Sequence, residues 1–299
     1  MNKKKIILIG NIKNTFSLLK VIFKYSNNFD LFVITNKNKK KSDYFNLEPF
    51  CKKNKIPIYF TKDINNLQTF NKIKKFIPDY IFCFGWSQIL KKELLNIVKD
   101  FSLGYHPAKL PQNRGKHPLI WAIVLGLKET ASTFFKLDKK VDNGDIINQK
   151  KIKISSKDNA LSLYKKMEKI SCKQLNDILK RIISSKVKRI KIKTNNSNIW
   201  RKRNFKDGVI NWRMSSLNIL NLVKGLYYPY PFAGTYYNGK YISVKKVQII
   251  KKKIQNAEFG KILHLNKNKP HVKCGDYIIK ILSYEPKIKF KKDDYFDES

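Results

Sequence analysis

The 299-residue chain has little cysteine, and what it has is scattered. Its four cysteines, Cys51, Cys83, Cys172 and Cys274, are widely spaced and form no CxxC pair. A disulfide framework or a zinc site needs closely placed or paired ligands, so the pattern predicts neither. We therefore expect no metal, free thiols and the reducing environment of the cytoplasm.

Long apolar runs are also missing. The basic N-terminus, MNKKKIILIG, contains only a five-residue apolar run before Asn11, which is too short for a signal peptide. No stretch reaches the roughly 18 apolar residues of a membrane span. We therefore expect a soluble, cytoplasmic protein that has no membrane partner.

Arginine and acidic residues are scarce beside lysine. Only six of the 63 basic residues are arginine, and 22 acidic residues leave a formal net charge of +41. Such a charge is typical of proteins with anionic partners, because clustered basic residues release counterions from phosphate. The abundance of Asn and Ile equally fits drift towards A/T-rich codons, with much of the charge as solvated surface. The charge favours an anionic substrate without choosing among a folate polyglutamate, a nucleotide sugar and tRNA.

The first half of the chain alternates apolar runs with helical patterns. Buried parallel strands are predicted by KIILIGN, DLFVITN, IPIYFT and DYIFCFGW, at 5–11, 30–36, 56–61 and 79–86. Helical spacing in TFSLLKVIFKY and NKIKKFI places helices between them, so we expect an α/β fold with a doubly wound, mostly parallel sheet. Gly10 stands alone after the first run, so the GxGxxG fingerprint of dinucleotide binding is missing.

The rest of the sequence predicts a long helix, a linker and a small β domain. Ser155 stands three residues before Asp158 in a capping-box pattern, and apolar residues follow at helical spacing as far as residue 182. The polar stretch SSKVKRIKIKTNNSN suits a linker, and Asn238-Gly239 between alternating runs indicates a hairpin. We expect a first domain at 1–185, a linker at 186–205, and a C-terminal helix with a small OB-like β-barrel at 206–299.

The stretch LGYHPAKLPQNRGKHPLIWAI, residues 103–123, holds a histidine in a stiff loop. His106 lies just past a short apolar stretch, where open α/β sheets bind their ligands. Pro107 and Pro111 restrict the loop, and a predicted helix follows. A restrained neutral imidazole can take a proton from an attacking amine and return it to a leaving group. A structural histidine that caps the loop is the alternative.

A second polar residue follows the next apolar strand. FFKLDKKVDNGDII places Asp142 in a D-N-G turn, and by itself this is an ordinary turn aspartate. Its interest comes from the order of the segments: a strand ending in FGW, then His106 in a proline loop, then an apolar helix, then a strand ending in a D-x-G turn.

In that order the segments resemble the 10-formyltetrahydrofolate-dependent formyltransferases. The resemblance is carried by HPAKLPQNRG, PLIWAIVLG, KETASTFF and VDNGDIINQ. In the second half, WRKRNFKDGVINW and LVKGLYYPYPFAGTYYNG look like segments of methionyl-tRNA formyltransferase and of the nucleotide-amino-sugar N-formyltransferases. The resemblance extends from the first predicted strand to about residue 285. It implies the Rossmann-like sheet of that family, 10-formyltetrahydrofolate as co-substrate, and formyl transfer to an amine without a metal.

The resemblance places the family's catalytic histidine and aspartate on His106 and Asp142. Family members also have an asparagine two residues before the histidine, where this chain has Gly104. That asparagine is expected to donate a hydrogen bond to the formyl oxygen as it becomes an oxyanion, and loss of one such donor costs on the order of 10²–10³ in rate. Asn113, His117 or a backbone N–H are the candidate replacements. If none of them replaces the asparagine, the enzyme is slow, or its active site catalyses a different reaction.

The resemblance also implies binding residues. The folate is expected at Phe84, Gly85, Trp86, Ile89, Leu110, Pro111 and Val141, although core packing explains Phe84 and Trp86 equally well. The acceptor is expected at Arg114, Arg201, Arg203 and Tyr230, because arginine grips phosphate through two parallel hydrogen bonds. The tetrapeptide AKLP and Gly104, where the tRNA enzymes have SLLP and Asn, favour a nucleotide-linked amino sugar as acceptor. Methionyl-tRNA formyltransferase is the first alternative function, and a catalytically impaired binding protein on the same fold is the second alternative function.

Overall fold

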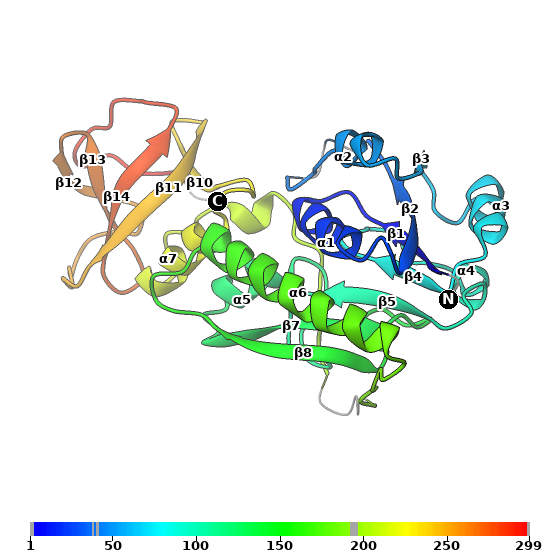
Figure 1. Ribbon diagram of the computed structural model, residues 1–299. Coiled ribbons are helices and arrows are strands. Elements are labelled where there is room, and N and C mark those ends of the chain that lie inside the picture. The colour runs from blue at the N-terminus through cyan, green and yellow to red at the C-terminus, as the bar shows by residue number, and fades with distance from the viewer. Residues whose placement is uncertain (1–2, 38, 40–41, 192–196, 298–299) are drawn as a thin grey trace. The chain divides into compact units, whose positions relative to one another are not determined.

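The computed structural model describes residues 3–37, 39, 42–191 and 197–297 (Figure 1). The chain divides into two compact units: the first holds Met1–Pro118, Thr130–Ile152 and Lys165–Trp200, and the second holds Leu119–Glu129, Lys153–Tyr164 and Arg201–Ser299. Each unit is thus assembled from separate stretches of sequence. Residues 192–196 of the expected linker lie outside the described residues, and the domain boundaries 1–185, 186–205 and 206–299 stay a prediction.

A seven-stranded sheet forms the core of the first unit, in the order β3-β2-β1-β4-β5-β7-β8. Parallel pairing runs from β3 through β2, β1 and β4 to β5, and β7 is antiparallel to β5. The strands are β1 (Lys4–Ile9), β2 (Phe29–Thr35), β3 (Ile58–Phe60), β4 (Tyr80–Cys83), β5 (Phe101–His106), β7 (Glu129–Lys136) and β8 (Ile146–Lys153). The mostly parallel sheet predicted from the apolar runs is confirmed.

Helices cover both faces of this sheet. Side chains alternate along a strand, so Ile6 and Leu8 of β1 join the core shared with α1 and α6, whereas Ile7 and Ile9 join the core shared with α3 and α4. The helices are α1 (Lys13–Phe23), α2 (Glu48–Lys53), α3 (Leu67–Phe76), α4 (Lys92–Asn96) and α6 (Ala160–Ile183). Because both faces are buried, the strands are apolar throughout, which confirms the doubly wound arrangement.

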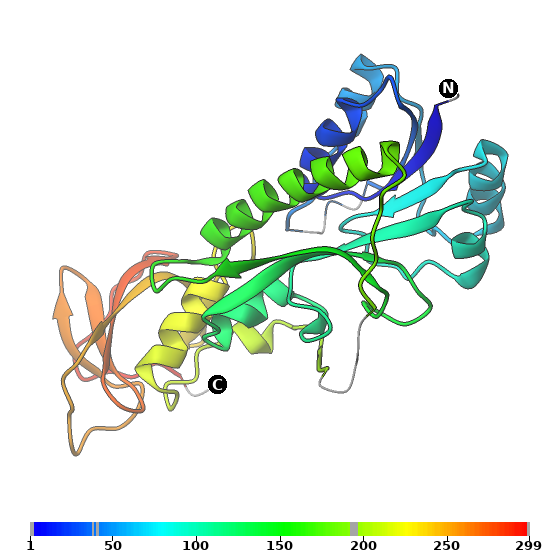
Figure 2. The ribbon, with the colours of Figure 1, turned by 60° about the horizontal axis from the view of Figure 1, so that its bottom comes forward.

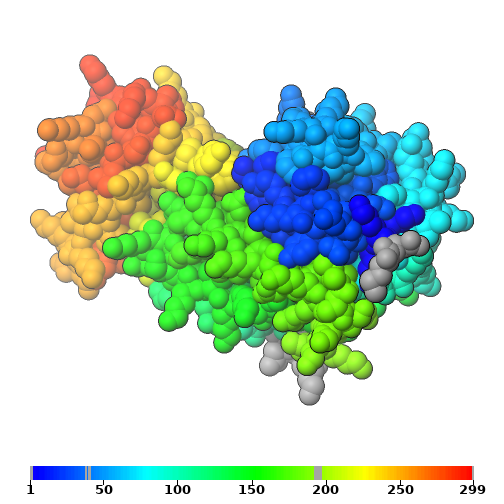
Figure 3. Space-filling view, in the orientation of Figure 1, coloured from blue at the N-terminus to red at the C-terminus, as the bar shows by residue number. Residues whose placement is uncertain are grey.

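α6 runs beside α1 on one face of the sheet (Figure 2). Ser171 Oγ of α6 donates a hydrogen bond to Asn14 Oδ1 of α1 at 3.1 Å, and Tyr25 Oη donates to Asn176 Oδ1 at 2.9 Å. In the space-filling view the side chains of α6, in green, lie directly against those of α1, in blue (Figure 3). Polar contacts therefore fix this helix pair in addition to its apolar core.

The N-terminus of α6 differs from the expected capping box. Ser155 and Asp158 do contact each other, because the N–H and Oγ of Ser155 donate to Asp158 Oδ2 at 2.7 and 3.0 Å. The helix begins only at Ala160, and the N–H of Ser162 donates to Asn159 Oδ1 at 2.9 Å while the N–H of Asn159 donates to Ser162 Oγ at 3.0 Å. The reciprocal cap is thus formed by Asn159 and Ser162, because the Asp158 carboxylate is engaged in closing the preceding turn.

The second unit contains a five-stranded antiparallel sheet, in the order β10-β11-β14-β13-β12. Asn238 and Gly239, with φ values of 48° and 71°, turn the chain from β10 into β11 and confirm the expected hairpin. Ile120 of α5 and Ile219 of α7 pack into its core. The elements are α5 (Pro118–Val124), α7 (Ser216–Gly225), β10 (Ala233–Tyr237), β11 (Lys240–Ile250), β12 (Ile262–Asn266), β13 (Lys269–Lys273) and β14 (Ile278–Glu285). The C-terminal β domain is confirmed.

Within the described ranges, no helix combines the length and apolarity that are needed to cross a membrane.

Candidate active site

Strand β5 carries the site residues on one of its faces. Phe101 and Leu103 point into the core shared with α1 and α6. Because side chains alternate along a strand, Ser102, Gly104 and His106 occupy the opposite face. His106, only 5% exposed, ends this row. The predicted catalytic histidine and the position of the family asparagine thus lie side by side on the sheet.

His106 is held through both of its ring nitrogens. Nε2 lies 2.8 Å from the carbonyl oxygen of Asn113, and Nδ1 lies 3.5 Å from Asp142 Oδ2. A carbonyl oxygen can only accept a hydrogen bond, so Nε2 carries a hydrogen, and Nδ1 faces the Asp142 carboxylate. The N–H of Gly115 donates to the same Asp142 oxygen at 3.0 Å. The structure therefore brings the two predicted catalytic residues together and orients the imidazole.

The turn that carries Asp142 has an unusual backbone. Asp142 has a φ of 49°, in the left-handed region that aspartate tolerates better than most residues. Two residues later, a Cβ on Gly144 would lie 1.7 Å from the carbonyl oxygen of Lys136, so only glycine fits there. The D-N-G sequence is therefore what allows the carboxylate to reach His106.

Gly104 leaves no vacant space for a side chain. A Cβ at this position would lie 2.6 Å from Leu137 Cδ2 and 2.8 Å from Phe135 Cζ. Apolar side chains thus fill the volume next to residue 104. The asparagine of the family does not fit here unless these neighbours move.

The predicted substitutes for that asparagine lie in the loop before α5. Asn113 donates its N–H to Asn198 Oδ1 at 2.8 Å, and its carbonyl accepts from His106. The N–H of Gly115 is directed at Asp142. His117 follows with a φ of 57°. Which donor meets a developing oxyanion stays a prediction.

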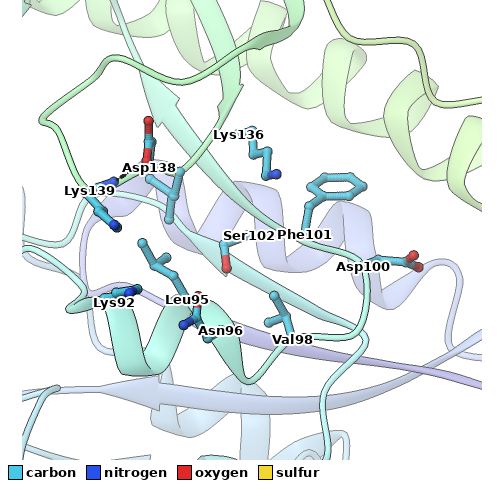
Figure 4. A pocket seen from close by; sticks show the side chains of 11 residues that line it. Lys92, Leu95, Asn96, Val98, Asp100, Phe101, Ser102, Lys136, Asp138 and Lys139 are labelled. Carbon is cyan, nitrogen blue, oxygen red and sulfur yellow. Dashed lines mark hydrogen bonds between the residues drawn. The ribbon is translucent and has the colours of Figure 1, made fainter.

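A cavity of about 370 Å³ opens on the same side of β5. Ser102, Leu95 of α4 and Leu137 line it, and Leu137 is also the side chain that packs against Gly104. Figure 4 shows the Ser102 hydroxyl pointing from β5 toward α4. Ser102 Oγ is buried and has no hydrogen-bond partner among the described residues. The other lining residues are Lys92, Asn96, Val98, Asp100, Phe101, Lys136, Asp138 and Lys139. The cavity thus lies beside the amino end of β5, at the opposite end of the strand from His106.

The residues predicted for folate binding are not those that line this cavity. Phe84 is fully buried and packs on Phe82 and Phe134, and Leu110 is 2% exposed. Ile89 and Val141 are exposed, Trp86 Nε1 donates to Gln88 Oε1 at 3.2 Å, and Gly85 and Pro111 lie in the loops after β4 and β5. Their role stays a prediction. In the sequence, Ser102 is the residue that could have indicated this cavity, because it is a polar residue within the apolar start of β5.

Arg114 is engaged within the first unit. Its Nη1 donates to Asn143 Oδ1 and its Nη2 to Ser197 Oγ, both at 2.9 Å. Asn143 follows Asp142 directly, so this guanidinium connects the turn that carries Asp142 to a distant segment of the chain. Its predicted role in acceptor binding is not tested by these contacts.

Arg201 and Arg203 form an aromatic and ionic cluster in the second unit. Both guanidinium groups lie over the ring of Trp121, at 5.4 and 4.7 Å from its centroid. Arg201 forms a bidentate pair with Asp207, and Arg203, 8% exposed, donates to the Asp207 carbonyl. The hydrogen bonds from Arg201 hold the pKa of Asp207 well below its usual range. Tyr230 is half-buried against the core of this unit, and acceptor binding by these residues stays a prediction.

The lowered pKa of Asp207 predicts a pH-dependent contribution to stability. This contribution to the free energy of unfolding is present at pH values above the ordinary aspartate pKa of about 3.9. It is lost as the pH falls through the lower pKa of the folded state. Asp207→Asn should lower the melting temperature at pH 7, and the gap to wild type should stay constant down to about pH 5 and narrow as the pH falls below about 4. Thermal melting of both proteins, with the exposed Asp177→Asn as control, measures this. A gap that does not narrow between about pH 5 and about pH 2 would contradict it.

No group of three or more His, Cys, Asp or Glu side chains that could hold a metal ion occurs in the part of the chain that the structure describes.

Family models identify the class of protein. One described as formyl transferase matches residues 4–179, and one described as formyl transferase, C-terminal domain, matches residues 204–296. The chain therefore belongs to the formyl transferase family of enzymes, which confirms the resemblance. A curated relative, the bifunctional polymyxin resistance protein ArnA of Wigglesworthia glossinidia brevipalpis, is 39% identical over 217 residues. The match covers 72% of this chain and 32% of the relative, so this chain spans about a third of that protein.

Solved structures share the fold. The N-formyltransferase from Helicobacter canadensis, in complex with folinic acid and dTDP-3-aminofucose, superposes with a TM-score of 0.70 at 20% identity, covering 93% of this chain and 98% of that one. The methionyl-tRNA formyltransferase from Clostridium thermocellum superposes with a TM-score of 0.62 at 20% identity, covering 84% and 95%. Both have a formyl transferase fold, and they differ in the acceptor that their names imply.

Proposed function

We propose that this enzyme transfers the formyl group of 10-formyltetrahydrofolate to the amine of a nucleotide-linked amino sugar. The observation that carries the proposal is the His106–Asp142 pair at the carboxyl end of β5. Family membership supplies the reaction class. The complex of the Helicobacter canadensis enzyme with folinic acid and dTDP-3-aminofucose supports both substrate classes.

The proposed reaction needs one proton acceptor. The amine nitrogen attacks the formyl carbon, and a new N–C bond forms as the bond from that carbon to the N10 nitrogen breaks. The amine loses a proton and the N10 nitrogen gains one, so the reaction balances without a further reactant. His106 Nδ1 is the atom suited to carry this proton, because Nε2 already donates to the Asn113 carbonyl. Asp142, 3.5 Å away, stabilises the imidazolium that forms.

We place the donor's bicyclic ring at the carboxyl ends of β4 and β5, where open α/β sheets bind their ligands. Trp86 and Ile89 in the loop after β4 and Pro111 in the loop after β5 offer apolar surface, and the backbone of Gly85 offers polar groups for the ring's edge. His106 ends β5 at this same edge of the sheet.

The acceptor distinguishes this function from its alternatives. Formyl transfer from 10-formyltetrahydrofolate is measured with a panel of nucleotide-linked amino sugars and with initiator methionyl-tRNA. We expect turnover with an amino-sugar nucleotide and none with tRNA. Turnover with tRNA alone, falling steeply with salt, would establish the methionyl-tRNA formyltransferase alternative. Folded protein that binds folinic acid but transfers no formyl group would establish the impaired binding protein.

A further inference from the structure

The loop before α5 touches both catalytic side chains. The Asn113 carbonyl accepts from His106 Nε2, and the N–H of Gly115 donates to Asp142 Oδ2. Between them, Arg114 donates to Asn143, the residue after Asp142. Three consecutive residues therefore set the position of the imidazole, the carboxylate and the turn that carries it.

A segment far along the chain holds this loop in place. Strand β6 (Arg114–Gly115) pairs in parallel with β9 (Ile199–Trp200), and Asn198 Oδ1 accepts the N–H of Asn113 at 2.8 Å. Ser197 Oγ accepts from Arg114 Nη2. The fit is close, because a Cβ on Gly115, where φ is 99°, would lie 2.3 Å from the carbonyl oxygen of Trp200. All of these residues belong to the first unit.

We infer that Asn198 is a positioning residue for catalysis. Its side-chain oxygen accepts the N–H of Asn113 and its backbone carbonyl accepts the N–H of Arg114 at 3.1 Å, so Asn198 holds the peptides on both sides of the Asn113 Cα. The Asn113 carbonyl between them accepts the hydrogen of His106 Nε2 and leaves Nδ1 facing Asp142. This inference rests on the function proposed above. Asn198 is exposed and lies outside the apolar core, so its effect on the site is separable from an effect on folding.

The size of the effect follows from how catalysis depends on geometry. A displacement of a reacting group by about 1 Å costs roughly 10²-fold in rate. Loss of the Asn198 acceptor leaves the β6–β9 pairing, so the Asn113 carbonyl shifts by less. We therefore expect Asn198→Ala to lower kcat by about tenfold, one order of magnitude below that limit, with the KM of each substrate changed less than about twofold. Asn198→Asp keeps an acceptor oxygen and should restore kcat to within about threefold of wild type.

The kinetic test uses the full chain and a matched control. Asn71→Ala removes an exposed asparagine from α3, far from this loop in sequence, and should leave kcat unchanged. If Asn198→Ala leaves kcat unchanged, as Asn71→Ala should, the inference is overturned. A raised KM with unchanged kcat would also overturn it, because Asn198 would then contact a substrate instead of positioning the base.

A second measurement does not depend on turnover. The ¹⁵N shifts of the His106 imidazole, assigned by loss of the signal in His106→Gln, report which nitrogen carries the hydrogen in the free protein. We expect Nε2–H in wild type and in Asn198→Asp, and a mixture of tautomers in Asn198→Ala. An unchanged tautomer in Asn198→Ala overturns the inference even if formyl transfer is confirmed. If wild type transfers no formyl group, the proposed function fails while this spectrum still decides the role of Asn198.

Discussion

Replacement of His106 with alanine should lower kcat for formyl transfer by about 10²–10⁴-fold, the usual contribution of a positioned general base. The imidazole is buried at the end of β5 and is held by Asn113 on one side and Asp142 on the other. The variant loses Nδ1, the atom that we propose carries the amine proton. Steady-state kinetics with the acceptor found in the panel measure this change.

Asp142→Asn separates orientation from charge. The amide retains an oxygen that accepts the Gly115 N–H, but it removes the negative charge beside Nδ1. We expect a loss of kcat smaller than that of His106→Ala, with the melting temperature close to that of wild type. Full activity of either folded variant would mean that the pair does not carry the proton, and the binding-protein alternative would then be tested next.

The fold was largely predictable because its signals are local. Each of the first four strands is a short apolar run bounded by polar residues, and the positive φ of Asn238 and Gly239 follows from their residue types. The division of the chain was not predictable in the same way. α5 and the first turn of α6 belong largely to the second unit, although their sequences adjoin strands of the first. Amphipathic spacing shows that a helix face is buried without showing which core receives it.

The site was predictable only in part, for a similar reason. His106 and Asp142 stand in motifs that resemble a known family, and the turn chemistry of Asp142-Asn143-Gly144 is visible in the sequence. Asn198 is 85 residues from Asn113, within a polar stretch that suggests only a linker. Contacts at such a separation leave no periodic pattern. Ser102 was visible as a polar residue in an apolar run, but only strand alternation connects it with Gly104 and His106.

Gly104→Asn tests whether this site lacks an oxyanion donor or is packed to do without one. The asparagine Cβ would come within 2.6 Å of Leu137 and 2.8 Å of Phe135, so the single substitution overpacks the site. We expect a cost of about 1–3 kcal/mol in the free energy of unfolding, with no gain in kcat. Chemical denaturation and steady-state kinetics of this variant measure both.

Removal of both obstructing side chains should change the outcome. In Gly104→Asn combined with Phe135→Ala and Leu137→Ala, the amide has room beside His106, and we expect kcat at least tenfold above that of Phe135→Ala combined with Leu137→Ala, because a restored donor is worth on the order of 10²–10³ in rate. The variant with the two alanines alone is the matched control, since it carries the same cavity. Equal kcat values in the two variants would show that an amide at position 104 does not act as the oxyanion donor in this site. The N–H groups of Asn113, Arg114 and Gly115 already donate to Asn198 and Asp142, so the donor would then come from outside this loop.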